Sequence, residues 1–213
     1  MSAGWPAAAF VLAYLSGSIP SAYLAGRWVK GVDLRTIGSG NLGTTNVYRE
    51  LGVGPALIVL AVDILKGFTP VYLLPGLIAA RSGVPADPAN WWGIACAVGA
   101  VLGHAKPIFL LWRGGGKGVA TAAGAFLALS AVPAAICVVV FVVIVATTRF
   151  VSLASLLASA ILPIVEWFMA GPSPVFYASL AVAVFVAWGH RSNIGRLRAG
   201  TEPRFRPPGE AQA

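Results

Sequence analysis

Charged residues are scarce in this 213-residue chain. They make up 10% of the sequence, whereas hydrophobic residues make up 58%, and the mean hydropathy is positive. Soluble domains have about a quarter of their residues charged, so this composition excludes an ordinary soluble domain. Acidic residues are the scarcest, with seven Asp and Glu against fifteen Lys and Arg. Because the basic residues lie between apolar runs and in the C-terminal tail, they indicate membrane topology rather than nucleic-acid binding.

Cysteine and histidine are also rare. Both cysteines, Cys96 and Cys137, lie within apolar runs, where cysteine behaves as a small hydrophobic residue, so a disulfide framework is not expected. No cluster of metal ligands with a recognised spacing occurs, and we expect neither a metal nor a cofactor. No basic residue precedes the first apolar run, which therefore lacks the charged start of a cleaved signal peptide. We expect this run to be a retained membrane span.

Long apolar runs take up most of the chain. A helix needs about 20 residues to cross about 30 Å of hydrocarbon, and cutting the sequence where Gly, Pro and charge cluster leaves seven runs. We therefore predict an all-α integral membrane protein, a single domain over residues 1–213, with seven transmembrane helices. The predicted spans are residues 6–26, 53–80, 91–111, 118–132, 134–148, 152–169 and 174–190.

The fourth and fifth runs are short, and Pro133 between them marks either a turn or a kink in one longer helix. With seven crossings and the N-terminus outside, thirteen of the fifteen basic residues fall in cytoplasmic segments, as the positive-inside tendency requires. Six crossings would place the five arginines of the tail outside. We therefore predict seven crossings, a cytoplasmic C-terminus, and polar loops that converge on the cytoplasmic face.

Residues 38–49, GSGNLGTTNVYR, form the most polar stretch. Gly38, Gly40 and Gly43 allow positive φ and leave backbone N–H groups uncovered, while Arg49 and several hydroxyl and amide side chains add donors suited to phosphate. The stretch also fits G-x-G-x-x-G, but a βαβ unit is not predicted around it, so a dinucleotide site is not expected. An ordinary interhelical loop is the alternative.

A second glycine-rich stretch is RGGGKGVAT at residues 113–121. Its triple glycine exposes consecutive N–H groups, Lys117 adds a charge, and the next apolar run begins a helix whose N-terminus favours anions. It is not a Walker A loop, because that pattern fails at Leu111 and Gly118. We predict an anion-binding loop, with a basic stop-transfer turn as the alternative.

Other polar residues recur at helical spacing. Asp63 and Lys66, three apart within an apolar run, would share a helix face, and we expect them to pair because an unpaired charge is costly there. The alternative is that Lys66 also supports a cytoplasmic anion site, if the helix bends at Gly67. His190, Asn193 and Arg196 recur at intervals of three, so a continuing last helix would place them on one face. A basic tail that contacts anionic lipid head groups is the alternative for this region.

Three segments, GSGNLGTTN..R, GH.KP......GGGKGVAT and H..NI.RL..G.E, together resemble the motifs of the bacterial acyl-phosphate:glycerol-3-phosphate acyltransferase family, the PlsY type. The resemblance spans residues 38–202, and DILKG and TRFVS also resemble stretches of that family. Gly116 is a departure, since a shorter glycine run would be expected. The resemblance implies a multi-pass membrane enzyme that moves an acyl group from acyl phosphate to the 1-hydroxyl of glycerol 3-phosphate. The products are lysophosphatidic acid and phosphate, in the first acylation of phospholipid synthesis.

The resemblance also implies site residues. Lys117, His190 and Arg49 are expected to act in catalysis. The expected substrate-binding residues are Ser39, Gly40, Asn41, Thr45, Asn46, His104, Gly115, Gly118, Thr121, Arg149, Ser152, Asn193, Arg196 and Glu202.

Both substrates carry phosphate, so two anion pockets beside an apolar channel are expected. We assign the acyl-phosphate head group to the glycine nests around Gly40 and Gly115, with help from Arg149 and Ser152. Arg149 could equally be a topology anchor. The residues assigned to glycerol 3-phosphate are Arg49, Lys117, His190 and Asn193, with Glu202 orienting a basic partner.

Acyl phosphate is an activated mixed anhydride, so alignment and charge stabilisation suffice and no enzyme nucleophile is required. The proton of the attacking hydroxyl passes either to a phosphate oxygen of the substrate or to His190. The other glycerophosphate acyltransferase chemistry uses His and Asp separated by four residues. That dyad is absent, because Phe109 lies five residues after His104 and Gly195 lies five after His190.

An anion transporter or channel and a non-catalytic scaffold are the rival classes. A transporter should show polar residues near mid-membrane and an inverted repeat, but only Asp63 and Lys66 lie at depth and the sequence has no repeat. A scaffold would leave the glycine and asparagine pattern unexplained. The expected partners are the two substrates and membrane lipid, without nucleic acid. We expect a monomer in the bacterial inner or plasma membrane, with its active site facing the cytoplasm.

Overall fold

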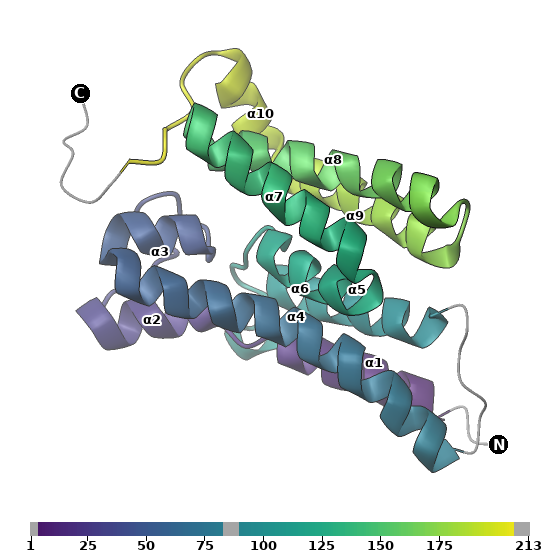
Figure 1. The fold of residues 1–213 in the computed structure, drawn as a ribbon. Coiled ribbons are helices and arrows are strands. Elements are labelled where there is room, and N and C mark those ends of the chain that lie inside the picture. The colour runs from purple at the N-terminus through teal and green to yellow at the C-terminus, as the bar shows by residue number, and fades with distance from the viewer. Residues whose placement is uncertain (1–3, 83–89, 207–213) are drawn as a thin grey trace. The chain divides into compact units, whose positions relative to one another are not determined.

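The computed structural model describes residues 4–82 and 90–206, and every regular element in these ranges is a helix (Figure 1). This confirms the predicted all-α class and leaves no βαβ unit around residues 38–43 in the described chain. The helices are α1 (Gly4–Gly17), α2 (Ser21–Lys30), α3 (Thr44–Leu51), α4 (Val53–Ser82), α5 (Trp91–Ala105), the 3-10 helix η1 (Ile108–Leu110), α6 (Val119–Leu129), α7 (Ala131–Thr148), α8 (Val151–Ala170), α9 (Pro174–Gly189) and α10 (Arg191–Arg198).

The helices group into two compact units, Met1–Ala131 and Val132–Ala213. In the first unit, α4 packs against α1, α5 and α6, and α3 packs against α2 and α4. In the second unit, α8 and α9 lie side by side and α10 contacts both (Figure 1). The prediction of one domain over the whole chain stays a prediction.

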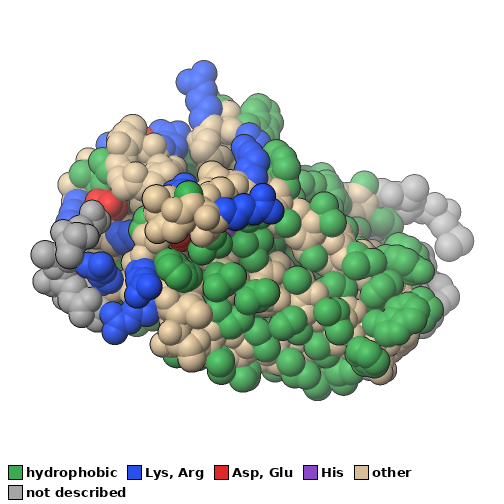
Figure 2. All heavy atoms as spheres, turned by 90° about the horizontal axis from the view of Figure 1, so that it is seen from above, with side chains coloured by type: hydrophobic (Ala, Val, Ile, Leu, Met, Phe, Trp, Pro, Cys, Tyr) green, Lys and Arg blue, Asp and Glu red, His purple; other side chains and the backbone are tan. Residues whose placement is uncertain are grey.

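Five helical segments of the described chain are long and apolar enough to cross a membrane: Pro6–Lys30, Val53–Arg81, Trp91–Leu110, Ala131–Thr148 and Val151–Ala170. The apolar helices Val119–Leu129 and Pro174–Gly189 are shorter. These segments overlap the seven predicted runs, although seven crossings and their orientation stay a prediction. Figure 2 shows hydrophobic side chains over much of the face in view, as expected of a surface that meets lipid.

Glycines bring the helices of the first unit into backbone contact. A Cβ atom on Gly67 of α4 would lie 2.0 Å from the carbonyl oxygen of Thr121 in α6, and one on Gly124 of α6 would lie 2.0 Å from that of Ile64 in α4. Small residues are a usual packing device in membranes, because apolar side chains gain little by leaving lipid for one another. Helix α4 is thereby held against the helix that follows the second glycine-rich stretch.

The first predicted span, 6–26, is divided in the structure. Helix α1 ends at Gly17 and α2 begins at Ser21. Pro20 explains the break, because proline has no N–H to donate and disfavours the helical conformation of the preceding residue, here Ile19.

Two other predicted boundaries are resolved by the structure. Helix α6 ends at Leu129 and α7 begins at Ala131, so runs four and five are separate helices. Pro133 lies in the first turn of α7, where a missing N–H costs no helical hydrogen bond. Helix α9 (Pro174–Gly189) ends where the seventh predicted run ends, and His190, with ψ of 11°, separates it from α10.

Candidate functional site

The first polar stretch, residues 38–49, folds as a tight loop followed by α3. Gly38 and Gly40 have φ of 59° and 68°, in the predicted left-handed region. Gly43 does not use this conformational freedom, because it caps α3 with φ of −121° and an N-cap residue is normally extended. Two of the three glycines therefore shape the loop through positive φ.

The buried side chain of Asn46 stabilises this loop through hydrogen bonds to its backbone. Its Oδ1 accepts the backbone N–H of Ser39 at 2.9 Å, and its Nδ2 donates to the carbonyl oxygens of Leu34 and Ile37, each at 3.3 Å. A Cβ atom on Gly38 would lie 2.3 Å from Asn46 Oδ1. The buried amide thus organises the loop backbone, while its contact with substrate stays a prediction.

The second glycine-rich stretch uses its glycines in two ways, for positive φ and for close packing. Gly114, Gly115 and Gly118 have φ of 92°, 148° and 78°. Gly116 has no unusual φ but packs directly on His104, since a Cβ atom there would lie 1.9 Å from His104 Nε2. The glycine that departs from the family pattern is therefore required by local packing.

The two glycine-rich stretches lie side by side within the first unit. The Leu42 N–H donates to the Gly115 carbonyl oxygen at 3.2 Å, and Arg35 Nη1 donates to the Arg113 carbonyl oxygen at 3.2 Å. A Cβ atom on Gly114 would lie 2.8 Å from Cδ of Arg35. This confirms the predicted convergence for these two loops.

Arg35 is a further residue of these loops that was not predicted from the sequence. Asp33 holds its guanidinium, with Nη2 and Oδ2 2.6 Å apart, and Arg27 lies 3.7 Å from the same carboxylate oxygen. The hydrogen bond from Arg35 lowers the pKa of Asp33 from 3.8 to about 2, against an opposing effect of burial. An acid two residues before an arginine, in the polar segment that leads to Gly38, is the signal that could have identified it.

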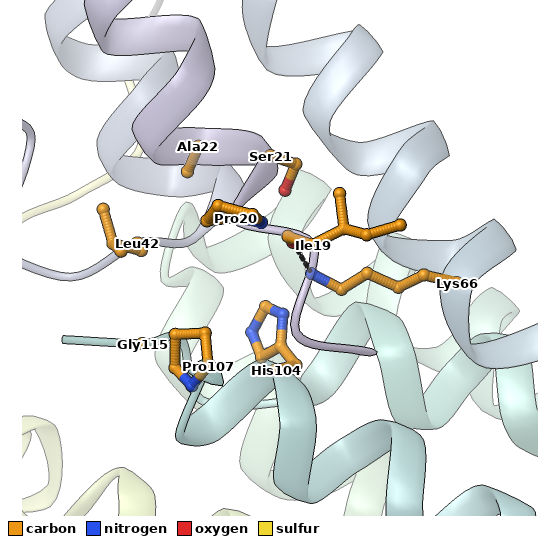
Figure 3. Close-up of a pocket in the computed structure, with 9 residues that line it drawn as sticks. All are labelled: Ile19, Pro20, Ser21, Ala22, Leu42, Lys66, His104, Pro107 and Gly115. Atoms are coloured by element: carbon orange, nitrogen blue, oxygen red, sulfur yellow. Dashed lines mark hydrogen bonds between the residues drawn. The ribbon is translucent and has the colours of Figure 1, made fainter. Parts of the chain in front are cut away.

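A small pocket with room for about one water molecule lies beside these loops (Figure 3). Lys66 and His104 reach it from α4 and α5, and Lys66 pairs with Asp63 at 2.7 Å, which confirms the predicted pairing. The lining residues are Ile19, Pro20, Ser21, Ala22, Leu42, Lys66, His104, Pro107 and Gly115.

The remaining predicted residues of the first unit lie on α3 and at the start of α6. Thr45 lies in the first turn of α3, and Arg49 is exposed in its last turn. Lys117 is half-buried directly before Gly118, the N-cap of α6. Thr121 is fully buried, and its hydroxyl has no hydrogen-bond partner in the described chain.

Ser39 and Asn41 lie in the loop before α3, where the Asn41 N–H points to Ser39 Oγ at 3.4 Å.

The third predicted group lies in the second unit. Asn193 Nδ2 donates to Glu202 Oε1 at 2.6 Å, and Arg196 Nε donates to Glu202 Oε2 at 2.7 Å. Asn193 and Arg196 therefore share one face of α10 as predicted, and Arg196 is the basic partner expected for Glu202.

Glu202 is largely buried by this arrangement, with its side chain 6% exposed. Burial raises the pKa of Glu202, but Ser152, Asn193 and Arg196 outweigh it, so the pKa falls below its ordinary value of 4.5. Because the Ser152 hydroxyl has no partner at hydrogen-bond geometry among the described residues, we ascribe the lowering of the pKa mainly to the two nitrogen donors, whose distances are short.

His190 is buried at the junction of α9 and α10, and its Nδ1 lies 2.8 Å from the Val186 carbonyl oxygen. A carbonyl can only accept, so Nδ1 carries a proton, and in the neutral ring Nε2 is the acceptor nitrogen.

Arg149 lies at the turn between α7 and α8, with φ of 61°, an uncommon value for a residue other than glycine. Its carbonyl oxygen accepts the Phe205 N–H at 2.6 Å, which ties the C-terminal segment to this turn. Among the described residues, no three His, Cys, Asp or Glu side chains are grouped as a metal site requires.

Comparison with known proteins supplies the family. Residues 7–200 match the family model described as glycerol-3-phosphate acyltransferase. The chain belongs to the glycerol-3-phosphate acyltransferase family. Curated members with this name include one from Synechococcus sp. (strain CC9902), 42% identical over 94% of this chain and 95% of that protein, and one from Thermosynechococcus vestitus, 45% identical over 92% of each.

Two crystal structures of PlsY, an integral membrane glycerol 3-phosphate acyltransferase, are similar to the whole fold. One is the glycerol 3-phosphate form and the other the lysophosphatidic acid form. Each has a TM-score of 0.80 and 36% sequence identity. They cover 94% of this chain and 96% and 95% of their own chains, respectively. These matches confirm the resemblance to the PlsY type of the family.

Proposed function

We propose that this protein transfers an acyl group from acyl phosphate to the 1-hydroxyl of glycerol 3-phosphate, releasing lysophosphatidic acid and phosphate. The observation that carries the proposal is the junction of two glycine-rich loops through Leu42 and Gly115. The PlsY structures described as glycerol 3-phosphate and lysophosphatidic acid forms support the choice of acceptor and product.

The joined loops suit the departing phosphate. Positive φ at Gly38, Gly40, Gly114 and Gly115 allows the N–H groups of a loop to face one side, a geometry that binds anions. The N–H groups of Ser39, Gly40, Leu42 and Gly116 already donate within the protein, so we assign phosphate binding to the other N–H groups of these loops. In the reaction, the hydroxyl oxygen attacks the acyl carbonyl carbon and the bond from that carbon to the phosphate oxygen breaks. The electron pair leaves on phosphate, and N–H donors fixed in advance stabilise that charge.

The acyl acceptor, glycerol 3-phosphate, requires cations to bind its phosphate and side chains to orient its hydroxyl. We assign the phosphate of glycerol 3-phosphate to Arg49 and Lys117 of the first unit. That His190 and Asn193 orient the same substrate stays a prediction from the sequence. A planar guanidinium binds phosphate through two hydrogen bonds, whereas a lysine ammonium acts as a point charge. Correct alignment of the hydroxyl with the acyl carbon accounts for much of the rate enhancement in this type of reaction.

The proton of the attacking hydroxyl has two destinations. One is an oxygen of the substrate phosphate, which we favour. The other is Nε2 of His190, because the hydrogen bond between its Nδ1 and Val186 leaves Nε2 as the acceptor of the neutral ring.

Location follows from the sequence. We infer a multi-pass protein of the bacterial inner membrane whose loops at 38–49 and 113–121 face the cytoplasm, where glycerol 3-phosphate is dissolved. The apolar helices supply the lipid-facing surface that an acyl chain requires.

Turnover by the purified protein tests this function. The protein in detergent or lipid mesophase is given acyl phosphate and glycerol 3-phosphate, and release of phosphate and lysophosphatidic acid is followed. We expect turnover that requires both substrates, and none when an acyl thioester replaces acyl phosphate. A folded protein that releases no phosphate would refute the proposal, and turnover with the thioester alone would refute the choice of donor.

A further inference from the structure

Asp63 is a carboxylate buried in α4, 1% exposed, and one of its oxygens connects three side chains. Asp63 Oδ1 accepts the Ser21 hydroxyl at 2.6 Å, lies 2.7 Å from Lys66 Nζ, and faces His104 Nδ1 at 3.8 Å. Ionisable side chains within membrane spans are costly and normally mark functional positions.

The members of this cluster come from separate segments. Ser21 follows the break between α1 and α2, Lys66 lies on α4, and His104 lies on α5 near its end. Lys66 also donates to the Ile19 carbonyl oxygen at 3.0 Å, a group that the helix break leaves without a helical donor (Figure 3). Asp63 therefore holds three segments at fixed positions around the small pocket.

The opposite side of His104 faces the second glycine-rich loop. A Cβ atom on Gly116 would lie 1.9 Å from His104 Nε2, and the Gly116 N–H donates to the His104 carbonyl oxygen at 3.2 Å. The neighbouring Gly115 lies equally close to α5, because a Cβ atom there would lie 2.1 Å from the Ala105 carbonyl oxygen. The position of the imidazole thus limits the conformations that residues 114–116 can adopt.

The cluster of Asp63, Lys66, Ser21 and His104 differs in charge from the cations that are proposed to attract substrate. Asp63 and Lys66 together have no net charge and are both buried, so they add little attraction for a phosphate. Asp63 instead favours the tautomer of His104 that carries its proton on Nδ1, toward the carboxylate. The cluster is suited to orientation rather than to anion binding.

We propose that Ser21, Asp63 and Lys66 are positioning residues that orient His104, and that His104 in turn sets the conformation of residues 114–116 for acyl transfer. This inference rests on the proposed function. Displacement of a reacting group by about 1 Å can reduce a rate about 100-fold, so a loosened loop should lower kcat while leaving the affinity for glycerol 3-phosphate nearly unchanged.

The test compares Asp63→Asn with the double variant Asp63→Asn/Lys66→Gln. The single variant leaves Lys66 without its carboxylate, and we expect it to lose both thermal stability and activity. The double variant removes both charges and should recover stability. Its kcat should nevertheless stay about 10- to 100-fold below wild type, with KM for glycerol 3-phosphate within about twofold. Lys30→Gln, which removes a cation of the first unit outside the cluster, is the matched control and should retain wild-type kcat.

A double variant with wild-type stability and wild-type kcat would overturn the proposal, because the pair would then be only structural. If that variant does not fold, His104→Ala decides, since it leaves the Asp63–Lys66 pair in place. A similar loss in kcat at unchanged KM supports the proposal, and an unchanged kcat overturns it. Wild-type protein without turnover counts against the proposed function, whereas normal wild-type turnover with unaffected variants counts against the cluster alone.

Discussion

Glu202 illustrates at the scale of one residue how this chain uses its few acidic side chains. Its two oxygens accept hydrogen bonds from Asn193 and Arg196, and its pKa lies below 4.5. The folded state therefore prefers the charged form, and this carboxylate stabilises the end of the second unit at every pH at which it is ionised.

Glu202→Gln should remove a contribution to thermal stability that the wild type has at neutral pH and loses in acid. Because the folded pKa is lowered, the contribution of Glu202 is fully present above pH 4.5 and is lost as the pH falls through the folded value. We expect the wild type to melt at a higher temperature than the variant at neutral pH, and the difference to shrink below about pH 4.5. Thermal melts in detergent across this range measure it, and a difference independent of pH would contradict the role of the ionised carboxylate.

Lys117→Ala should abolish most activity without unfolding the protein. Loss of a cation that stabilises phosphate charge typically costs about 100- to 1000-fold in rate. Arg198→Ala, which removes an exposed cation of the tail, is the control and should retain wild-type turnover. Phosphate release together with a thermal melt measures both properties, and a fully active Lys117→Ala variant would remove this residue from the mechanism.

His190→Ala distinguishes the two destinations of the proton. A general base contributes about 100- to 10,000-fold, so a loss of that size would assign the proton to His190. We expect a loss below about tenfold, consistent with transfer to the substrate phosphate. The measurement is kcat at saturating concentrations of both substrates.

At the scale of the helices, glycine positions determine packing. Helix α4 contains glycines in two environments: Gly67 touches the backbone of α6, whereas a Cβ atom on Gly76 would lie more than 4 Å from any other described part of the protein, its own helix backbone excepted. The same substitution in one helix therefore probes backbone contact separately from helix propensity.

Gly67→Ala should destabilise the first unit. The added methyl group would overlap the Thr121 carbonyl oxygen, and overpacking of this kind costs about 1–3 kcal/mol. Gly76→Ala should be neutral or slightly stabilising, because alanine is the better helix former by about 1 kcal/mol. Melting temperatures of the two variants in the same detergent measure the difference. Equal melting temperatures would mean that the contact between α4 and α6 is looser than described.

The sequence predicted the helical class, the Asp63–Lys66 pair and the shared face of Asn193 and Arg196, because each follows from local periodicity or from the cost of a buried charge. The internal role of Asn46 could not be predicted in this way. Its partners include backbone carbonyls nine and twelve residues earlier, and loop conformation decides such contacts. The link from Arg35 to Arg113 spans 78 residues and depends on tertiary packing.

At the scale of the whole molecule, membrane topology stays a prediction. Cysteine labelling in a background without Cys96 and Cys137 tests it. We expect Thr36→Cys and Ala199→Cys to react with a membrane-impermeant reagent from the cytoplasmic side, because positively charged segments remain there. Arg81→Cys should react only from the opposite side.

Labelling of positions 36 and 199 from opposite sides would contradict the seven predicted crossings, which place both positions on the cytoplasmic side. Reaction of position 81 from the cytoplasmic side would contradict the assignment of α4 as a complete crossing. Retained turnover in each cysteine variant is the control for a native fold.

The helix break at Pro20 has a consequence for how the protein is inserted into the membrane during synthesis. The Ile19 carbonyl oxygen accepts the Ser21 N–H within its own turn and also Lys66 Nζ, which the ribosome adds 47 residues later. The first span therefore enters the bilayer with this oxygen bonded only to Ser21 and still lacking its second donor. Maturation of the first span must await delivery of the second, so the two are coupled during biogenesis.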